Sequence, residues 1–261
     1  MASSPRVLVS LSAYACEGGL DGRHRPATCF SPVIALDRQA GPGDAEGLWE
    51  DYETVLDLAA RVGVAGLCLE LSWARLEPRR GHRDESALER YRQVVDHARG
   101  RGLFVGVAAI DAAWPAWLGQ EAWLMPWVVP VAVEYAHWLS SSISADSWSL
   151  FAERRRLTGG FLDDRAGPPW RSSAIEDERS AAHHLEAISQ GARNGATTWV
   201  TSAVVAHDDL SDAARLSTDE VHVRSLVRGV GPLASQRGLV ARRDGEWMLV
   251  DDELPSELRR A

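Results

Sequence analysis

The chain has 261 residues and a formal net charge of -9; the length suits one α/β barrel or two small domains, and the charge argues against nucleic acid and anionic membranes as partners. All 28 basic residues are arginine, which excludes lysine chemistry such as a Schiff base or a P-loop lysine. The three cysteines are scattered, which indicates free thiols in a reducing compartment, and we therefore expect a cytoplasmic protein.

The N-terminal segment is predicted to form the first strand, over residues 6–14. Residues 7–16 are also the only candidate for a signal peptide, but one arginine precedes them and two serines interrupt their apolar pattern, which favours a strand. A long loop follows over residues 20–45, and apolar residues at helical spacing then predict a helix over residues 45–62. No apolar run in the sequence is long enough to span a membrane.

The next strand is the most informative stretch of the sequence. Residues 64–71 form a nearly unbroken apolar run after a helix, as expected of a parallel strand that is buried on both faces. Strand alternation places Cys68, Glu70 and Ser72 on one face and the intervening leucines on the other. The leucine face suits packing against helices, whereas the polar face suits a barrel lumen or a cleft.

The rest of the chain alternates between helices and strands. In order, we expect a helix over residues 84–101 with Asp84 as its N-cap, a strand over 103–110, a helix within 121–139 that starts at or after Pro126, a weak strand over 140–147, a charged loop over 153–172, a helix over 174–193, a strand over 197–205, a helix over 218–236 and a hairpin over 239–250. This alternation predicts right-handed βαβ units and a parallel sheet or barrel, whose sites lie where strands end.

Seven short pieces of the sequence, in order, resemble glycoside hydrolase family 1, the β-glucosidase family. Residues 12–18, SAYACEG, resemble its Ser-Ala-Tyr-Gln-x-Glu-Gly, and residues 69–78, LELSWARLEP, resemble its Phe-Ser-Ile-Ser-Trp-x-Arg-Ile-x-Pro. The other pieces are residues 88–91, 114–118, 157–159, 181–185 and 200–203, the last followed by the Asp-Asp pair at 208–209. The resemblance implies a TIM-barrel-like α/β domain that occupies residues 1–261.

The sequence departs from this family where the family carries its catalytic glutamates, one acid/base and one nucleophile, which lie about 5–5.5 Å apart. The resemblance places the acid/base position at Asp146 and Ser147 and the nucleophile position at Ser202. It places a sugar-binding glutamine at Ala15 and a sugar-binding histidine at Asp111. Because a serine does not ionise as a carboxylate does, a retaining β-glycosidase is not expected.

The sequence is also shorter than the family pattern. The helix over residues 174–193 leads directly into the strand that resembles the seventh of eight, so about two strand–helix units are missing. Because strand number, tilt and shear are linked, the remaining strands cannot close a barrel built for eight. We expect a shortened TIM-barrel-like fold with a C-terminal β-hairpin, in which the hairpin or a second copy in a homodimer covers the open edge.

The candidate catalytic residues are Asp111, Asp146 and Glu17, because a carboxylate buried near a strand end has a raised pKa and can transfer protons. Asp111 has an alternative role as a cap of the following backbone, and Glu17 as an anchor of its loop. Ser147 and Ser202 are candidate binding residues, with replacement of the family's glutamates as the alternative.

The remaining candidate binding residues are Tyr14, Glu70, Trp73, Trp114 and Trp148. Glu70 has an alternative role as the partner of a buried arginine. The three tryptophans either line an apolar ligand cavity or pack in the core.

These features predict a repurposed, non-hydrolytic protein with a small-molecule pocket. We expect a proton-transfer enzyme of the cyclase or isomerase type that acts on a largely apolar natural-product intermediate. The alternatives are a non-catalytic relative that binds a ligand or a partner protein, and a residual glycoside hydrolase. We expect no cofactor, and no metal site at His183 and His184, because adjacent helical residues point in different directions.

Overall fold

The computed structural model describes residues 8–22, 26–195, 197, 199–200, 239–243 and 246–250. The predicted helix over residues 218–236, the predicted strand beyond Val200 and the candidate residue Ser202 lie outside the described residues.

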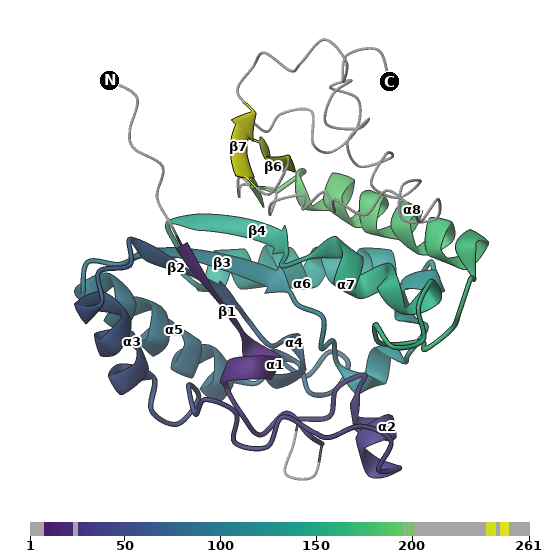
Figure 1. Ribbon diagram of the computed structural model, residues 1–261, viewed down its shortest axis with the longest axis horizontal. Helices are drawn as coiled ribbons and strands as arrows, with labels where there is room; N and C mark the ends of the chain where they lie inside the picture. The colour runs from purple at the N-terminus through teal and green to yellow at the C-terminus, as the bar shows by residue number, and fades with distance from the viewer. Residues whose placement is uncertain are drawn as a thin grey trace.

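The described part of the chain is built on a five-stranded parallel sheet whose strands follow one another in chain order (Figure 1). The strands are β1 (Leu8–Ser12), β2 (Gly66–Glu70), β3 (Phe104–Ile110), β4 (Ser147–Phe151) and β5 (Trp199–Val200). The long helices that connect them are α3 (Tyr52–Arg61), α5 (Glu85–Gly100), α6 (Val128–Ser142) and α8 (Ile175–Ala192).

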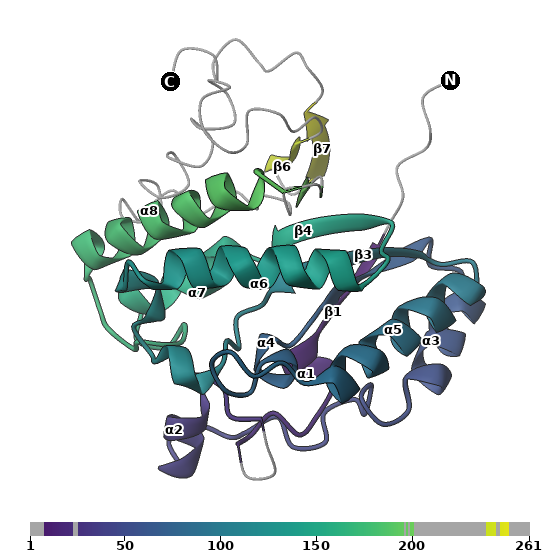
Figure 2. The same ribbon diagram turned by 180° about the vertical axis from the view of Figure 1, so that it is seen from behind.

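The helices lie on one side of this sheet. Helices α3, α5 and α6 are behind the strands in Figure 1 and in front of them in Figure 2, which is seen from the opposite side. Sequential strand order with helices on a single face is the arrangement of a barrel wall, whereas a doubly wound sheet has helices on both faces. The prediction of a shortened TIM-barrel-like α/β fold is therefore confirmed.

Short elements occupy the connections. They are α1 (Ala13–Cys16), α2 (Ser31–Ala35), α4 (Trp73–Leu76), α7 (Arg154–Thr158) and the 3-10 turns η1 (Ala116–Leu118), η2 (Ala122–Leu124) and η3 (Gly159–Phe161). The loops predicted over residues 20–45 and 153–172 thus contain short helices. Strands β6 (Leu239–Arg243) and β7 (Glu246–Val250) pair antiparallel, as the hairpin prediction requires. Closure of the open edge by this hairpin or by a homodimer stays a prediction.

The helix starts show how local chemistry sets the element boundaries. Asp84 caps α5 as predicted, since its Oδ1 accepts hydrogen bonds from the backbone N–H groups of Ser86 at 2.9 Å and Ala87 at 3.0 Å. Helix α3 begins at Tyr52, later than predicted, because the Asp51 side chain caps it by accepting from the Thr54 N–H at 3.4 Å. Helix α6 begins after Pro126, as expected.

The fourth strand was predicted in the wrong place. Residues 140–142 are the last turn of α6, and β4 starts only at Ser147. Serine disfavours helix interiors because its hydroxyl competes for backbone groups, but here each hydroxyl bonds a carbonyl one turn earlier: Ser141 bonds His137 and Ser142 bonds Trp138, both at 2.7 Å. Asp146 and Ser147 therefore lie at the amino end of β4, opposite the edge at which we expected them.

The two faces of the sheet differ as the sequence of β2 predicted. The register aligns Ser10, Cys68, Gly106 and Ser147 across the sheet, and one layer further on it aligns Ser12, Glu70, Ala108 and Ser149. These small or polar residues share the face opposite to the leucines of β2.

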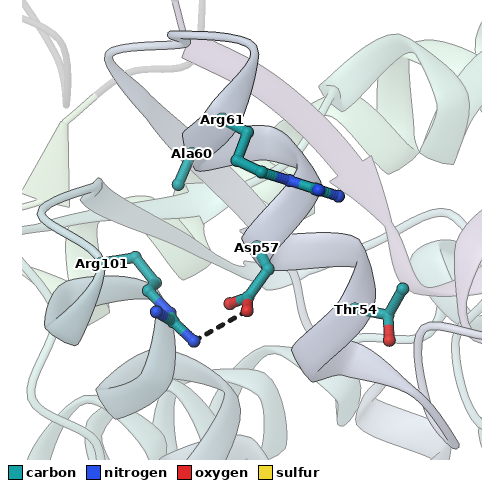
Figure 3. Close-up of a pocket in the computed structure, with 5 residues that line it drawn as sticks. All are labelled: Thr54, Asp57, Ala60, Arg61 and Arg101. Carbon is teal, nitrogen blue, oxygen red and sulfur yellow. Dashed lines mark hydrogen bonds and ion pairs between the residues drawn. The ribbon is translucent and has the colours of Figure 1, made fainter.

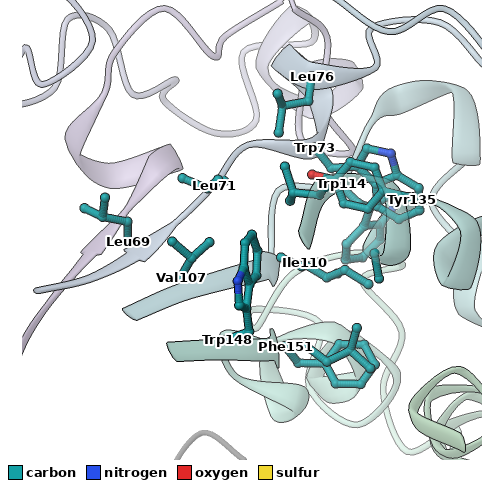
Figure 4. Packing of buried hydrophobic residues seen from close by; sticks show 14 of the residues in the cluster. Leu69, Leu71, Trp73, Leu76, Val107, Ile110, Trp114, Tyr135, Trp148 and Phe151 are labelled. Carbon is teal, nitrogen blue, oxygen red and sulfur yellow. The ribbon is translucent and has the colours of Figure 1, made fainter. Parts of the chain in front are cut away.

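The leucine face packs into the main hydrophobic core, which Figure 4 shows from close by. Leu69 and Val107 come from the sheet and Leu71 directly follows β2, and the Trp73 ring stacks on Tyr135 of α6 with 4.3 Å between centroids. The core therefore lies between the sheet and its helices, which leaves the carboxyl edge and the opposite face available for a site.

Candidate functional site

The carboxyl edge of the sheet gathers three buried polar atoms without a hydrogen-bond partner: the Tyr14 hydroxyl, Glu70 Oε2 and Asp111 Oδ2. Glu70 is the last residue of β2, Asp111 follows β3 directly, and Tyr14 lies in α1, directly after β1. Parallel strands present their carboxyl ends at one edge, so the three residues come from neighbouring positions of the sheet. The structure thus brings together three of the residues that the sequence singled out.

Asp111 is the most deeply buried of these groups, with 1% of its surface exposed. Its Oδ1 accepts a hydrogen bond from the Ala113 N–H at 3.1 Å, which is the capping role considered above, while its Oδ2 is unpartnered. Burial raises the pKa of Asp111 well above its usual value, and the negative charge of Glu70 raises it further. The two roles considered for Asp111 use different oxygens of one carboxyl group.

Glu70 lies on the polar face and is 8% exposed. Its Oε1 accepts a hydrogen bond from the Ser10 hydroxyl at 2.9 Å. None of the arginine side chains that the structure describes forms an ion pair with Glu70, so the arginine partner stays a prediction. Glu70 Oε2 is therefore the second carboxyl oxygen at this edge without a hydrogen-bond partner, in addition to Asp111 Oδ2.

Tyr14 and Cys29 extend this edge. The Tyr14 ring packs on Phe30 with 4.9 Å between centroids, and burial raises the pKa of Tyr14 to about 12, so its hydroxyl keeps its proton. Cys29 is buried, and its Sγ lies 3.5 Å from the Ala112 carbonyl oxygen. Burial, followed by the charge of Asp111, raises the pKa of the Cys29 thiol well above its usual value.

The contacts of Glu17 show that it anchors the turn after β1. Arg75 Nε donates to Glu17 Oε2 at 2.7 Å, and the Tyr91 hydroxyl lies 2.8 Å from Oε1. Arg75 also donates to the Gly18 carbonyl and lies over the Trp49 ring at 4.0 Å. The cluster ties the turn after β1 to helices α4 and α5, and both oxygens of Glu17 are occupied, which is the anchoring alternative.

Asp146 and Ser147 do not reach the carboxyl edge. Asp146 Oδ2 accepts from the Val105 N–H at 2.8 Å, and its Oδ1 lies 3.4 Å from Arg99. It therefore clamps the amino ends of β3 and β4, and Ser147 is the first residue of β4. Their expected positions at a strand end are wrong because β4 starts later than predicted.

The three candidate tryptophans pack in the core, the alternative considered above. Trp73, Trp114 and Trp148 are 0%, 1% and 6% exposed. Trp73 Nε1 donates to Glu77 at 3.0 Å, and Trp114 Nε1 donates to the Gly119 carbonyl at 2.8 Å. Each of these two indoles thus has its partner inside the protein.

Glu153 was not recognised as a candidate. Strand β4 ends at Phe151, so Glu153 lies two residues beyond the carboxyl end of a strand, whereas the position that the resemblance assigned to the acid/base glutamate, Asp146 and Ser147, lies at its amino end. Glu153 Oε2 lies 2.8 Å from Arg156 Nε, and the charge of Arg156 also acts on Asp111. The sequence signal that could have revealed Glu153 is the apolar pattern of residues 148–151, which marks a strand that ends two residues before it.

A separate surface pocket of about 450 Å³ lies between α3 and α5, lined by Thr54, Asp57, Ala60, Arg61 and Arg101 (Figure 3). Asp57 accepts from Arg101 at 2.7 Å and also contacts His97 at 2.7 Å, on the helix beside it. Asp57 and Arg101 are thus paired with each other and join α3 to the end of α5. Among the described residues, no group of three or more His, Cys, Asp or Glu could hold a metal, and no helix is long and apolar enough to cross a membrane.

Comparison with solved structures agrees with the fold. The structure superposes on the AHE enzyme from Alicyclobacillus herbarius with a TM-score of 0.69 at 16% identity, over 88% of this chain and 58% of that one. It also superposes on the rice β-glucosidase Os3BGlu6 with a TM-score of 0.66 at 16% identity, over 84% and 52% of the two chains. These identities support the fold alone.

The curated relatives carry the family relationship. A chloroplastic β-glucosidase-like SFR2 protein of Oryza sativa subsp. japonica is 25% identical over 193 residues, which is 70% of this chain and 28% of the relative. A β-galactosidase of an Arthrobacter species is 29% identical over 141 residues, or 43% and 19% of the two chains. The chain is a divergent glycoside hydrolase family 1-like protein. No family model matches the sequence of this family 1-like protein, which spans under a third of the length of these curated relatives.

Proposed function

We propose that this family 1-like protein is a proton-transfer enzyme of the cyclase or isomerase type, with Asp111 as its general acid. The observation that supports the proposal is the Oδ2 atom of Asp111, which is buried, unpartnered and part of a carboxyl group whose pKa is well above its usual value. A raised pKa favours the protonated form of the carboxyl group, which can donate its proton to a bound molecule.

The proposed reaction needs a base beside this acid. Glu70 has an unpartnered Oε2 on the neighbouring strand, and its negative charge acts on Asp111. In the proposed cycle, Asp111 Oδ2 donates a proton to a basic atom of the substrate, such as a carbonyl oxygen or an alkene carbon. Glu70 Oε2 accepts a proton from an adjacent carbon, so the substrate is isomerised or cyclised without a net change in composition. The proton then returns from Glu70 to Asp111 after product release, which restores the enzyme.

The proposed substrate is a small, largely apolar natural-product intermediate. Gly106 and Ala108 of β3 lie on the same face as Glu70 and present no bulky side chain there. The Tyr14 hydroxyl, which retains its proton, supplies one further hydrogen-bond donor to orient a polar group of the substrate. Few polar contacts and small wall residues support a mostly apolar molecule with a single reactive polar group.

The test is incubation of the purified protein with a small-molecule extract of its host, followed by mass spectrometry. Wild type, Asp111→Asn and a control, Asp37→Asn, are compared; Asp37 is exposed with a φ of 53°, a conformation that asparagine adopts readily. We expect a compound that changes structure at constant mass with wild type and Asp37→Asn, and not with Asp111→Asn. Equal conversion by Asp111→Asn would contradict the proposal, and retention of an unchanged compound would favour a binding protein.

A second candidate, residual glycoside hydrolysis, is supported by Glu153, a carboxylate that lies just beyond the carboxyl end of β4, where a general acid could act. Its test is release of the aglycone from aryl β-glucosides and β-galactosides. We expect any such activity to fall about 100-fold or more in Glu153→Gln, the scale typical of losing a general acid–base group. Unchanged hydrolysis in Glu153→Gln would exclude this role for Glu153.

A further inference from the structure

Helix α6 carries one hydroxyl group on its buried side. The buried residues of the helix follow the three- and four-residue spacing that forms a single stripe, and they are Val128, Ala132, Tyr135, Ala136 and Leu139. The other four members of the stripe are apolar, and a phenylalanine ring would fill the place of Tyr135 equally well. Packing therefore does not explain the hydroxyl, because a buried hydroxyl without a partner costs free energy.

The Tyr135 hydroxyl is enclosed by the protein. The residue is 1% exposed, and its oxygen has no hydrogen-bond partner among the described residues. The ring stacks on Trp73 with 4.3 Å between centroids, and Figure 4 shows the hydroxyl directed from α6 toward the sheet. Because the stack holds the ring in place, the hydroxyl stays directed at the interior.

Asp111 is the group with which this hydroxyl interacts most strongly. Burial is the main cause of the raised pKa of Tyr135, and the charge of Asp111 comes next. Ile110 and Trp114, which flank the Asp111 turn, belong to the same core cluster as Tyr135. Asp111 is itself 1% exposed, and its Oδ2 also lacks a partner. A buried donor without an acceptor and a buried acceptor without a donor thus belong to one region of the core.

The surroundings of Asp111 offer little stabilisation to its ionised form. Its Oδ1 accepts from the Ala113 N–H at 3.1 Å, and the charges of Glu70 and Glu17 that act on it are negative. The positive charge of Arg156 comes after these causes, and that side chain is 52% exposed to solvent. A general acid that gives up its proton in such a place leaves a buried carboxylate that a further hydrogen-bond donor would stabilise.

We propose that Tyr135 is a positioning residue for Asp111, and that its hydroxyl donates a hydrogen bond to Asp111 Oδ2 once that oxygen is ionised. In the proposed reaction Asp111 transfers its proton from Oδ2 to the substrate, while Tyr135 keeps its own proton and stabilises the carboxylate. The hydroxyl and Oδ2 are free to meet, since neither makes another hydrogen bond among the described residues. The catalytic role of Tyr135 rests on the proposed proton transfer, whereas the bond itself can be measured without a substrate.

The test is an infrared titration of the full chain from pH 4 to 10 that follows the protonated carboxyl band of Asp111. The band is identified by its loss in Asp111→Asn. We expect the apparent pKa of Asp111 to rise by about one unit or more in Tyr135→Phe, because the carboxylate loses a charge-assisted hydrogen bond and the protonated form is thereby favoured.

Tyr52→Phe is the matched control. Tyr52 is a second buried tyrosine on a helix, but its hydroxyl lies 3.4 Å from Glu53 Oε1 at the start of α3. We expect this change to leave the titration of Asp111 as it is in wild type. A loss of any buried phenol would act alike in the two variants, so a difference between them is specific to Tyr135.

A second replacement tests the proposal even if Tyr135→Phe does not fold. 3-Fluorotyrosine at position 135 has nearly the same shape as tyrosine and is a stronger hydrogen-bond donor, so we expect it to lower the apparent pKa of Asp111. The charged residues that act on Asp111 and Tyr135 are unchanged in every protein compared, so a shift reports the hydroxyl: they are Glu70, Glu17, Arg156, Glu77 and Arg83.

Three results would overturn the proposal: Asp111 titrates alike in wild type and Tyr135→Phe, its pKa falls in Tyr135→Phe because the phenol accepts from the acid, or Tyr52→Phe shifts it equally. None of them depends on conversion of a substrate. Conversion that requires Asp111 beside an unchanged titration would refute the role of Tyr135 alone, whereas a shifted titration without any conversion would refute the proposed function and leave the hydrogen bond standing.

Discussion

Two buried carboxyl groups at the same end of the sheet have opposite surroundings. Glu17 is bonded through both oxygens, to an arginine and a tyrosine, and its cluster joins the turn after β1 to two helices. Asp111 has one backbone hydrogen bond and one unpartnered oxygen, and the nearest charge acting on it is that of another carboxylate. Burial raises the pKa of both groups, but only the second keeps an oxygen that a ligand could bind.

The difference between Glu17 and Asp111 distinguishes structural residues from candidate site residues, and it does not depend on any catalytic motif. Completed polar clusters are typical of structural roles, because an unsatisfied buried group costs about 1–3 kcal/mol. Groups left incomplete are typical of positions at which a ligand completes them. The four predictions below test this contrast.

The largest effect is expected at Glu17. Replacing it by glutamine leaves the Arg75 guanidinium, whose side chain is 9% exposed, without its counter-charge. We expect Glu17→Gln to lower the free energy of unfolding by about 3–5 kcal/mol, the cost of breaking a buried ion pair, as measured by urea denaturation. The control Glu46→Gln, at an exposed glutamate, is expected to change it by less than about 0.5 kcal/mol. A loss at Glu17 no larger than that of the control would show that the cluster is not structural.

Asp111→Asn is expected to act in the opposite direction. The pKa of Asp111 is raised in the folded state, so the unfolded chain loses this proton first, and stability falls as pH rises above about 4, the unfolded pKa. Asparagine cannot ionise, so the variant is expected to be more stable than wild type at pH 7, by about 1.4 kcal/mol for each unit of the pKa difference. The check is urea denaturation from pH 4 to 8; a variant less stable than wild type throughout would contradict the assignment.

A smaller effect is expected from Glu70→Gln. Burial is the main cause of the raised pKa of Asp111, and the charge of Glu70 is the second. Removing that charge lowers the pKa of Asp111 and therefore weakens the fall of stability with pH, while burial keeps part of it. The pH dependence should lie between those of wild type and Asp111→Asn. A profile identical to wild type would mean that the two carboxyl groups are not coupled.

The smallest effect is expected at Cys68. Burial, followed by the charge of Glu70, raises its pKa to about 11. Its alkylation by iodoacetamide, followed by peptide mass spectrometry, should therefore be slow at pH 8 and rise about tenfold per pH unit towards pH 10, because only the thiolate reacts. The same measurement in Glu70→Gln should show faster alkylation of Cys68 at pH 8. Equal rates in the two proteins would argue against a charge on Glu70.

Much of the fold could be predicted from local patterns. Strand alternation was enough to assign the two faces of β2, and a single aspartate was enough to place the start of α5, because both depend on neighbours in the sequence. The start of β4 could not be placed this way, since three consecutive serines look unlike a helix until their hydroxyls bond the preceding turn. That error displaced the expected site to Asp146 and left Glu153 unrecognised.

The candidate site was predictable in composition but not in detail. The sequence indicated carboxylates at strand ends, and Asp111 and Glu70 lie there. It gave no means of telling that Glu17 is fully bonded while Asp111 is not, because the partners of Glu17 are 58 and 74 residues away along the chain. Hydrogen-bond completion is a long-range property, and it is what distinguishes these residues.

The matching order of strands in the chain and in the sheet has a consequence for how the protein folds. Each strand of the five-stranded sheet after β1 pairs with the strand before it, so every strand–helix unit can dock on the completed ones as soon as it leaves the ribosome. A closed barrel must also bring its first strand to its last, which requires a contact across most of the chain and slows folding. The four pairings of the five-stranded sheet all join consecutive strands, and we therefore expect this sheet to assemble from the N-terminus by short-range steps.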